Sequence, residues 1–146
     1  MNCIFCEIAE GKARADILYQ DEFIISFLDI RPMNYGHSLV IPRKHYESFL
    51  EIPPNNLSAV INGVQIIFRA MSDSLNPDGI NIVSNNGSAA GQSVLHFHFH
   101  IIPRFHSDEF KIRLNLKTYK GSSQKDFADK IRSCLPGKQF ISNVKE

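Results

Sequence analysis

The pattern of apolar and polar positions predicts short strands around one long helix. Residues 16–30, DILYQDEFIISFLDI, hold two apolar runs separated by the polar QDE, which is typical of a hairpin turn. After a loop with proline, asparagine and glycine, SLVIP at residues 38–42 predicts a third strand. From residue 55 to about residue 75 apolar side chains recur at three- and four-residue spacing, which predicts an amphipathic helix. The preceding PPNN predicts a rigid entry and a capping asparagine.

The second half of the chain adds strands and a short helix. INIVSN predicts a fourth strand by its alternation and β-branched content, and NGSAAGQS after it predicts a loop of small residues. The segment HFHFH, residues 96–100, predicts a fifth strand, and QKDFADKIRSCL predicts a short C-terminal helix. Strands interrupted by one long helix indicate an α+β fold with a mostly antiparallel sheet of about five strands.

Size and charge place the chain among ordinary soluble domains. It has 146 residues, 43% hydrophobic and 21% charged, and we expect one domain with a core in residues 1–104 and an extension in residues 105–146. Its 16 basic and 15 acidic side chains form no block of like charge, which argues against a nucleic-acid surface. There is no apolar run of about 18 residues and no secretory signal, so we expect a cytoplasmic protein with no membrane partner.

The alternating histidines call for a chemical explanation. In a strand His96, His98 and His100 share one face, while the phenylalanines between them share the other. A solvated polar face is one interpretation, and a mononuclear metal enzyme with a carboxylate on a neighbouring strand is another. Residues two apart on a strand are separated by about 6.6 Å, so one metal ion can take one or two of the three rings but hardly all. The three histidines therefore have different roles.

Two of the three cysteines form a Cys-x-x-Cys pair at the start of the chain. Cys3 and Cys6 are candidates for zinc ligation, for redox chemistry or for plain burial, and the odd count argues against a disulfide framework. Cys134 has no evident partner in the sequence, and we expect it to be buried or inert.

Four segments then point to a family. CIFCEI, FLDIRPMNYGHSLVIPRKH, NIVSNNGSAAGQSV and HFHFHIIPR follow the order and spacing of the histidine triad (HIT) superfamily of nucleotide hydrolases and transferases, over most of residues 2–104. The chain most resembles the histidine-triad nucleotide-binding proteins, which are purine nucleoside phosphoramidases, and their zinc-containing bacterial relatives. The resemblance implies a HIT-like fold and a homodimer.

The resemblance also implies catalytic roles. His98 matches the nucleophile that attacks the α-phosphorus and forms a covalent nucleotidyl-histidine. His100 matches a residue that contacts the phosphate, and Ser93 matches one that hydrogen-bonds the phosphate or the leaving group. His37 matches a histidine that contacts the catalytic residues without touching the substrate. Without the resemblance, Ser93 and His37 are ordinary residues at the start of strands.

Further positions match the nucleotide site of the family. Asp29 corresponds to the acid that binds the ribose hydroxyls, and small residues such as Gly91 let backbone N–H groups close on an anion. The other matches comprise purine-pocket walls and polar contacts to ribose or phosphate: Phe5, Ile8, Phe27, Ile30, Leu39, Asn85 and Gln92. From the pattern alone, the five apolar members of this set are core residues.

In relatives with the cysteine pair, zinc is held by two cysteines and two histidines, which correspond here to Cys3, Cys6, His45 and His96. Four protein ligands close a tetrahedral shell, so this zinc would be structural, and no catalytic cofactor is required.

The expected activity is hydrolysis of a purine nucleotide conjugate, either a nucleoside phosphoramidate or an aminoacyl adenylate. Alternatives are a dinucleoside polyphosphate hydrolase, a nucleotide-binding regulatory module with little turnover, and a metal-dependent oxidoreductase. The chain departs from the phosphoramidases in having no tryptophan and a long tail after Pro103. The resemblance therefore does not indicate which leaving group the substrate carries.

Overall fold

The structure is a computed structural model that describes residues 3–111 and 114–136. The chain divides into two compact units, residues 1–110 and 111–146, and each is described by itself. The predicted limit of the core at residue 104 falls at the end of the last strand, shortly before this boundary.

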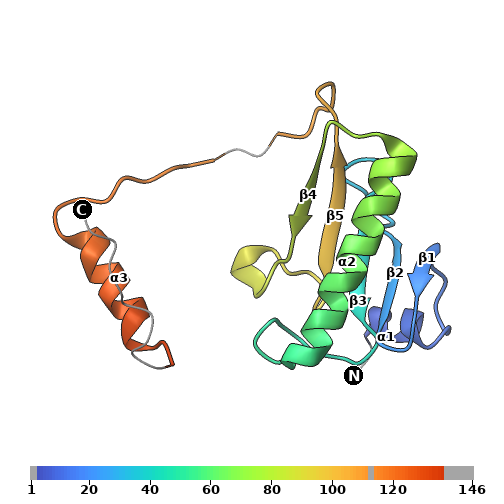
Figure 1. Ribbon diagram of the computed structural model, residues 1–146, viewed down its shortest axis with the longest axis horizontal. Helices are drawn as coiled ribbons and strands as arrows, with labels where there is room; N and C mark the ends of the chain where they lie inside the picture. Colours follow the sequence, from blue (N-terminus) through green and yellow to red (C-terminus); the bar gives the residue numbers. More distant parts are fainter. Residues whose placement is uncertain (1–2, 112–113, 137–146) are drawn as a thin grey trace. The chain divides into compact units, whose positions relative to one another are not determined.

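The first unit contains all the strands and the long helix (Figure 1). Its elements in chain order are α1 (Ile4–Ala9), β1 (Ile17–Gln20), β2 (Ile24–Leu28), β3 (Ser38–Pro42), α2 (Pro54–Leu75), β4 (Gly79–Val83), the 3-10 helix η1 (Ser88–Ala90) and β5 (Phe99–Arg104). The strands form one sheet in the order β1-β2-β3-β5-β4, and all neighbours pair antiparallel. This confirms the predicted α+β fold with a five-stranded antiparallel sheet.

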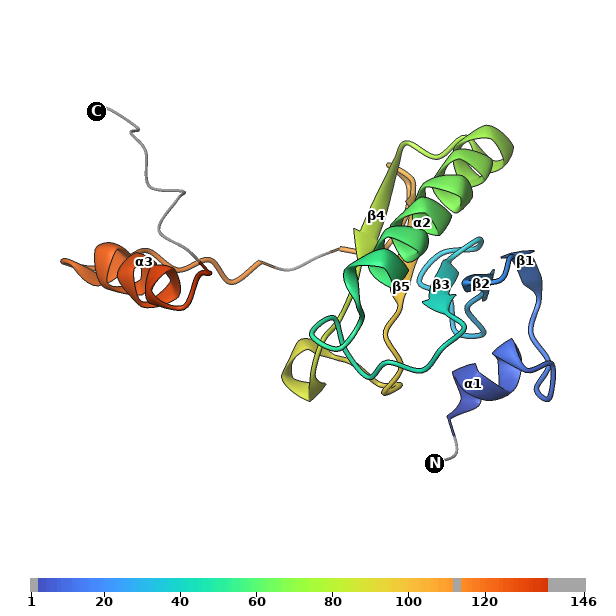
Figure 2. The same cartoon turned by 60° about the horizontal axis from the view of Figure 1, so that its bottom comes forward.

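The sheet is covered on both faces, by α2 on one side and by α1 on the other (Figure 2). Alternation along the strands produces this arrangement, because successive side chains point to opposite faces. In β2, Ile24 packs in the core under α2, whereas Ile25 packs in the core under α1. The short α1 is held by burial of Phe5 and Ile8, which are 7% and 8% exposed.

The N-terminus of α2 differs from the prediction. Its N-cap residue is Pro53, Pro54 follows within the first turn, and no side chain caps the helix, so the predicted capping asparagine is wrong. Proline suits the first helical position because its φ is already helical and its missing N–H would have no intrahelical partner. The helix ends at Leu75, and the C-cap residue Asn76 adopts the left-handed conformation with φ of 46°, one that asparagine tolerates better than most residues.

The strand predicted to carry all three histidines is shorter than expected. β5 begins at Phe99, so His100 lies on the ladder but His96 and His98 precede it. The backbone before β5 makes a hydrogen bond outside the sheet, because the Phe97 N–H donates to the Tyr46 carbonyl at 2.6 Å. The alternation nevertheless persists, with Phe97 1% exposed in the core under α2 and the histidines on the opposite face.

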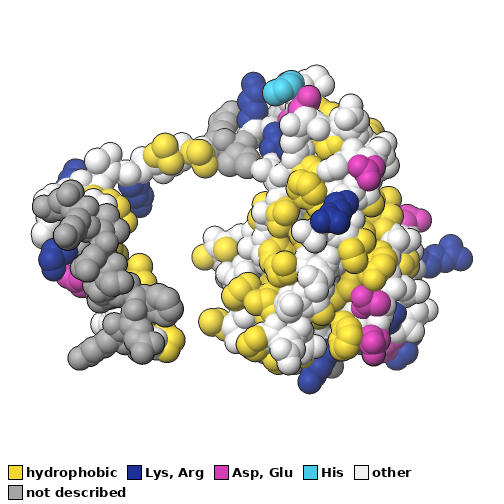
Figure 3. Space-filling view, in the orientation of Figure 1, with side chains coloured by type: hydrophobic (Ala, Val, Ile, Leu, Met, Phe, Trp, Pro, Cys, Tyr) yellow, Lys and Arg dark blue, Asp and Glu magenta, His cyan; other side chains and the backbone are white. Residues whose placement is uncertain are grey.

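The outer surface of the first unit on the side of α2 shows apolar side chains among scattered charged ones (Figure 3). Between the C-terminal half of α2 and the first strands lies a cavity of about 530 Å³, whose apolar wall includes Leu18, Leu28, Ile66 and Met71. Tyr19 is the one titratable residue that lines it among the residues described. This cavity therefore offers little chemistry.

The second unit contains the predicted C-terminal helix, α3 (Ser123–Ser133), in which no residue is buried. We expected Cys134, directly after this helix, to be buried or inert; it is exposed, so burial is wrong, while its inertness stays a prediction. Asp129 pairs with Lys125 and Arg132 along the helix surface. Within residues 3–111 and 114–136, every helix is too short or too polar to cross a bilayer.

Candidate active site

A cavity of about 540 Å³ opens on the face of the sheet that carries α1. Its volume lies in the range of about 300–1,000 Å³ that is usual for small-molecule sites. The wall is mainly apolar and includes side chains from α1, β2 and β3. Its polar groups come from the α1–β1 connection, from the β2–β3 connection, and from β5 and the segment that leads into it. The lining residues are Ile4, Phe5, Ile8, Arg14, Ala15, Phe27, Leu28, Asp29, Ile30, Arg31, Leu39, Ser93, Val94, His98 and His100.

His98 lies at this cavity with a defined tautomer. Its Nδ1 is 2.6 Å from the His96 carbonyl oxygen, which only accepts, so the proton is on Nδ1 and Nε2 carries a lone pair. The side chain is 3% exposed, and this burial lowers the pKa of His98 below its ordinary value, so the ring is neutral at pH 7. The edge-to-face packing of Phe5 on His98, with ring centroids 5.2 Å apart, fixes the ring plane. A neutral imidazole with a free, oriented Nε2 is a competent nucleophile.

A second pair of histidines lies beside His98, and its hydrogen-bond directions can be assigned. The Met33 N–H donates to Nδ1 of His37 at 3.1 Å, so a neutral His37 carries its proton on Nε2. That Nε2–H lies 2.9 Å from Nδ1 of His100 and donates to it, which leaves His100 with an N–H on Nε2. The Asp29 carboxylate is 3.7 Å from His37 Nε2, too far for a hydrogen bond.

Both rings of this pair are neutral at pH 7. Burial lowers the pKa of His37, and burial together with His98 and His37 lowers the pKa of His100 to about 4. The site thus offers a nucleophilic nitrogen on His98 and an uncharged hydrogen-bond donor on His100.

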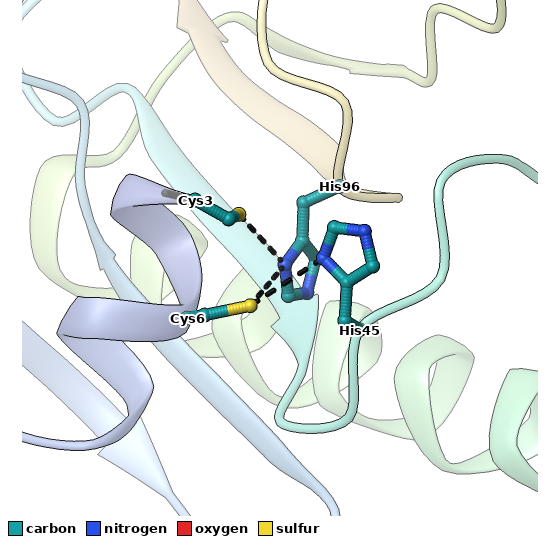
Figure 4. Close-up of side chains that lie close together, drawn as sticks. All are labelled: Cys3, Cys6, His45 and His96. Atoms are coloured by element: carbon teal, nitrogen blue, oxygen red, sulfur yellow. Dashed lines mark hydrogen bonds between the residues drawn. The ribbon is translucent and has the colours of Figure 1, made fainter. Parts of the chain in front are cut away.

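The first histidine of the triad belongs to a different group of side chains (Figure 4). His96 Nδ1 lies 3.5 Å from the sulfur of Cys3 and 3.6 Å from that of Cys6, and His45 Nδ1 lies 3.4 Å from Cys6. The four ligand atoms all lie within 4.8 Å of one another. A tetrahedral zinc ion with bonds of about 2.3 Å to sulfur and 2.0–2.1 Å to nitrogen separates S and N by about 3.6 Å. The cluster therefore fits a metal ion of this kind.

The surroundings of the cluster orient its ligands. His96 Nε2 donates to the Pro42 carbonyl oxygen at 2.8 Å, so its Nδ1 lone pair faces the two sulfurs. Burial, followed by the neighbouring Cys3, raises the pKa of the Cys6 thiol to about 11. The Cys6 thiol therefore resists ionisation, and a bound divalent metal would reverse this.

The structure brings most of the predicted nucleotide residues to one cavity. Those that line it are Phe5, Ile8, Phe27, Asp29, Ile30, Leu39, Ser93, His98 and His100. Ser93 is exposed there, and Asp29 is half-buried, with one carboxylate oxygen accepting from the Arg31 N–H at 2.8 Å.

Four predicted residues do not line the cavity. His37 lies behind His100, while Asn85 and Gly91 belong to the loop around η1. Gln92 is 9% exposed and its amide holds that loop: it accepts from Gly87 N–H and donates to the Glu47 and Val94 carbonyls. Its hydrogen-bonding groups are therefore already used within the protein.

Sequence reasoning missed several lining residues: Ile4, Arg14, Ala15, Leu28, Arg31 and Val94. Arg31 directly follows Asp29 and Ile30, both predicted to bind the nucleotide, so the sequence offered a signal for it. Arg14 and Ala15 lie in the polar connection between α1 and β1, where no motif or periodicity marks them.

The fold and this site define a HIT domain protein, and comparison with known proteins agrees. The HIT domain model matches residues 10–107, so the chain belongs to the HIT domain family, whose members bind and hydrolyse nucleotides. An uncharacterised HIT-like protein of Methanocaldococcus jannaschii is 51% identical over 106 residues, which cover 73% of this chain and 81% of the relative. The adenylylsulfatase HINT3 of Arabidopsis thaliana is 37% identical over 146 residues, covering 96% and 74%.

Solved structures share the fold. A crystal structure of a HIT family protein from Bacillus subtilis has a TM-score of 0.87 at 37% identity, covering 94% of this chain and 99% of that one. A zinc-bound histidine triad protein from Mycobacterium smegmatis has a TM-score of 0.72 at 40% identity, covering 80% and 85%.

Proposed function

We propose that this protein hydrolyses nucleotides at the α-phosphate through a covalent adduct on His98. One observation carries the proposal: a buried, neutral His98 holds its proton on Nδ1 against the His96 carbonyl and lines a cavity of about 540 Å³. Nothing in this arrangement requires a metal at the reacting atoms, because the imidazole is itself the nucleophile.

The reaction proceeds in two displacements. In the first, a bond forms between His98 Nε2 and phosphorus while the bond from phosphorus to the leaving group breaks. The His100 Nε2–H and the Ser93 hydroxyl donate to the phosphate oxygens or to the departing atom. The His98 ring becomes cationic in the adduct, and the His96 carbonyl stabilises it through the Nδ1–H. Water then attacks phosphorus, the P–N bond breaks, and a nucleoside monophosphate is released.

The cavity wall supports a purine nucleotide as substrate. Phe5, Ile8, Phe27 and Leu39 present apolar surface on which a base can stack, and Asp29 offers a carboxylate to ribose hydroxyls. The leading substrate class is therefore purine nucleoside phosphoramidates and aminoacyl adenylates.

A second substrate class is favoured by two cationic side chains. Arg14 and Arg31 line the same cavity, and guanidinium groups pair well with phosphate. A leaving group with several negative charges, such as the polyphosphate of a dinucleoside polyphosphate, would be stabilised there. The adenylylsulfatase among the relatives also carries a name that implies an anionic leaving group.

Zinc is the metal that best fits the Cys/His cluster. Cys3, Cys6, His45 and His96 would hold it, and the ion would supply a closed tetrahedral centre that ties α1 to the segment entering β5. Its role would be structural. The homodimer implied by the resemblance also remains a proposal, which sedimentation equilibrium tests.

Product analysis tests the proposed hydrolysis. The protein is incubated with adenosine 5′-phosphoramidate and, separately, with diadenosine tetraphosphate, alongside His98→Ala and the control His106→Ala, which changes a histidine that is 93% exposed. We expect AMP from the phosphoramidate with the unmutated protein and the control, and none with His98→Ala. ATP and AMP from the dinucleotide alone would shift the assignment to polyphosphates. Cleavage of neither substrate would contradict the hydrolase and favour a binding module.

A further inference from the structure

The tautomer assigned to the His37–His100 pair follows from a hydrogen bond to His37 Nδ1, which the backbone amide of Met33 donates. Met33 lies in the connection between β2 and β3, where residues 30–33 are all exposed. The base of this connection is closed by Asp29 N–H donating to the His37 carbonyl, at 2.9 Å. An exposed turn of this kind does not hold an amide in place by its own packing, so its anchor must come from elsewhere.

The anchor is the next residue, Asn34. Its side-chain amide donates to the Pro103 carbonyl at 2.9 Å and to the Asp108 carboxylate at 3.0 Å. Its own carbonyl accepts from the His37 N–H at 3.0 Å. Asn34 therefore connects the turn both to His37 and to the end of β5, the strand that carries His100.

Asp108 is itself tightly held. Its side chain is 7% exposed and pairs with Arg104 through both carboxylate oxygens, at 2.8 and 3.0 Å, while the Phe105 N–H donates to it at 3.0 Å. Arg104 also donates to Asn81 on β4, at 2.7 Å. A paired, multiply hydrogen-bonded carboxylate is a rigid acceptor for the Asn34 amide.

From this geometry we propose that Asn34, held by Asp108, is a positioning residue for the hydrolysis: it fixes the Met33 amide, which sets the tautomer of His37 and through it that of His100. The inference rests on the proposed function for its catalytic consequence. The tautomer itself is a property of the protein without substrate.

The consequence of losing this anchor follows from the hydrogen-bond directions. Without the Met33 donor, His37 can carry its proton on Nδ1, and its Nε2 lone pair then faces His100. To avoid two opposed lone pairs, His100 must move its proton to Nδ1 and present a bare Nε2 to the phosphate. The donor at the reacting group becomes an acceptor that repels the anion.

The test uses Asn34→Asp, which keeps the side-chain size but turns the donor toward Asp108 into a second carboxylate. Asn34→Ala is the alternative if the first variant unfolds, and Asn62→Ala, on the exposed side of α2, is the matched control. Imidazole ¹⁵N chemical shifts, measured without substrate, report the tautomers of His37 and His100. Turnover of the substrate that the unmutated protein cleaves gives kcat and KM, and thermal unfolding reports the fold.

We expect Nε2–H tautomers for both rings in the unmutated protein and the control, and a shift toward Nδ1–H in the Asn34 variants. We expect kcat to fall by about 10- to 100-fold with KM changed less than about threefold, because the donor acts most strongly in the transition state. Unchanged tautomers, or a lower unfolding temperature with unchanged kcat, would overturn the inference. If the unmutated protein cleaves nothing, the proposed hydrolysis fails, while the ¹⁵N shifts still decide whether Asn34 sets the tautomers.

Discussion

The Cys/His cluster leads to a quantitative prediction about folding. If zinc binds the native cluster, the free energy of unfolding must increase with free zinc, because the ion stabilises the folded state by RT ln(1 + [Zn]/Kd). This amounts to about 2.7 kcal/mol at 100 times Kd and about 1.4 kcal/mol for each further tenfold increase.

The size of the first unit converts this energy into temperature. Residues 1–110 carry the cluster, and an unfolding entropy of about 2.1 cal/mol/K per residue gives about 0.23 kcal/mol/K for the unit. We therefore expect the unfolding temperature to lie about 12 °C higher at 100 times Kd than with a chelator. Each further tenfold increase in free zinc should raise it by about 6 °C.

The assay is thermal unfolding followed by circular dichroism in a series of zinc buffers. Cys6→Ser removes a ligand that lies 3.4 Å from His45 and 3.6 Å from His96, and it should abolish most of the dependence on zinc. Cys134→Ser, which changes an exposed cysteine after α3, should leave it intact. An unfolding temperature that does not respond to zinc in the unmutated protein, or an equal response in Cys6→Ser, would refute the metal site.

Three further predictions concern pH, packing and binding. As pH falls from 6.5 toward about 4, His100 takes up a proton in the unfolded chain but not in the folded protein, where its pKa is about 4. The free energy of unfolding should therefore fall as pH decreases through this window and level off above pH 6.5. Urea titrations that show no such pH dependence would contradict the burial argument. Gly63→Ala places a Cβ 2.9 Å from Ile24 and 3.2 Å from Val40, where α2 approaches the sheet. Urea unfolding should show that the free energy of unfolding falls by about 1 kcal/mol, although alanine has the better helix propensity. An increase in the free energy of unfolding would show that the contact relaxes freely. Asp29→Ala should raise KM about tenfold with little change in kcat, because a charged hydrogen bond to ribose is lost in the ground state and the transition state alike. An unchanged KM in steady-state kinetics would show that Asp29 does not bind the substrate.

Periodicity predicted the sheet and the long helix because each buries a regular set of positions. Helix α1 was missed, since six residues with two buried apolar side chains give no periodic signal. The extent of β5 was overestimated for another reason. Alternation predicts the faces, which His96 and His98 keep, but the ladder depends on backbone partners that only the three-dimensional structure reveals.

The candidate site was predictable where single residues carry the chemistry. The resemblance pointed to His98 and His100, which line one cavity, and to the four residues of the Cys/His cluster, whose side chains lie together. It did not identify Asn34, whose role depends on Asp108 more than seventy residues later in the chain. Gln92 was predicted to contact the nucleotide because it is next to the site in the sequence. In the structure its side-chain amide instead makes hydrogen bonds within the protein that hold a loop.

The central claim is the covalent step at His98, and intact-mass analysis of a rapidly quenched reaction tests it most directly. The protein is mixed with an excess of the adenosine conjugate that it cleaves, quenched within the first turnover, digested and mapped. We predict an adenylyl group on His98 that disappears on longer incubation as AMP accumulates, and none in His98→Ala. Full turnover with no adduct on any histidine, or activity retained by His98→Ala, would contradict the account.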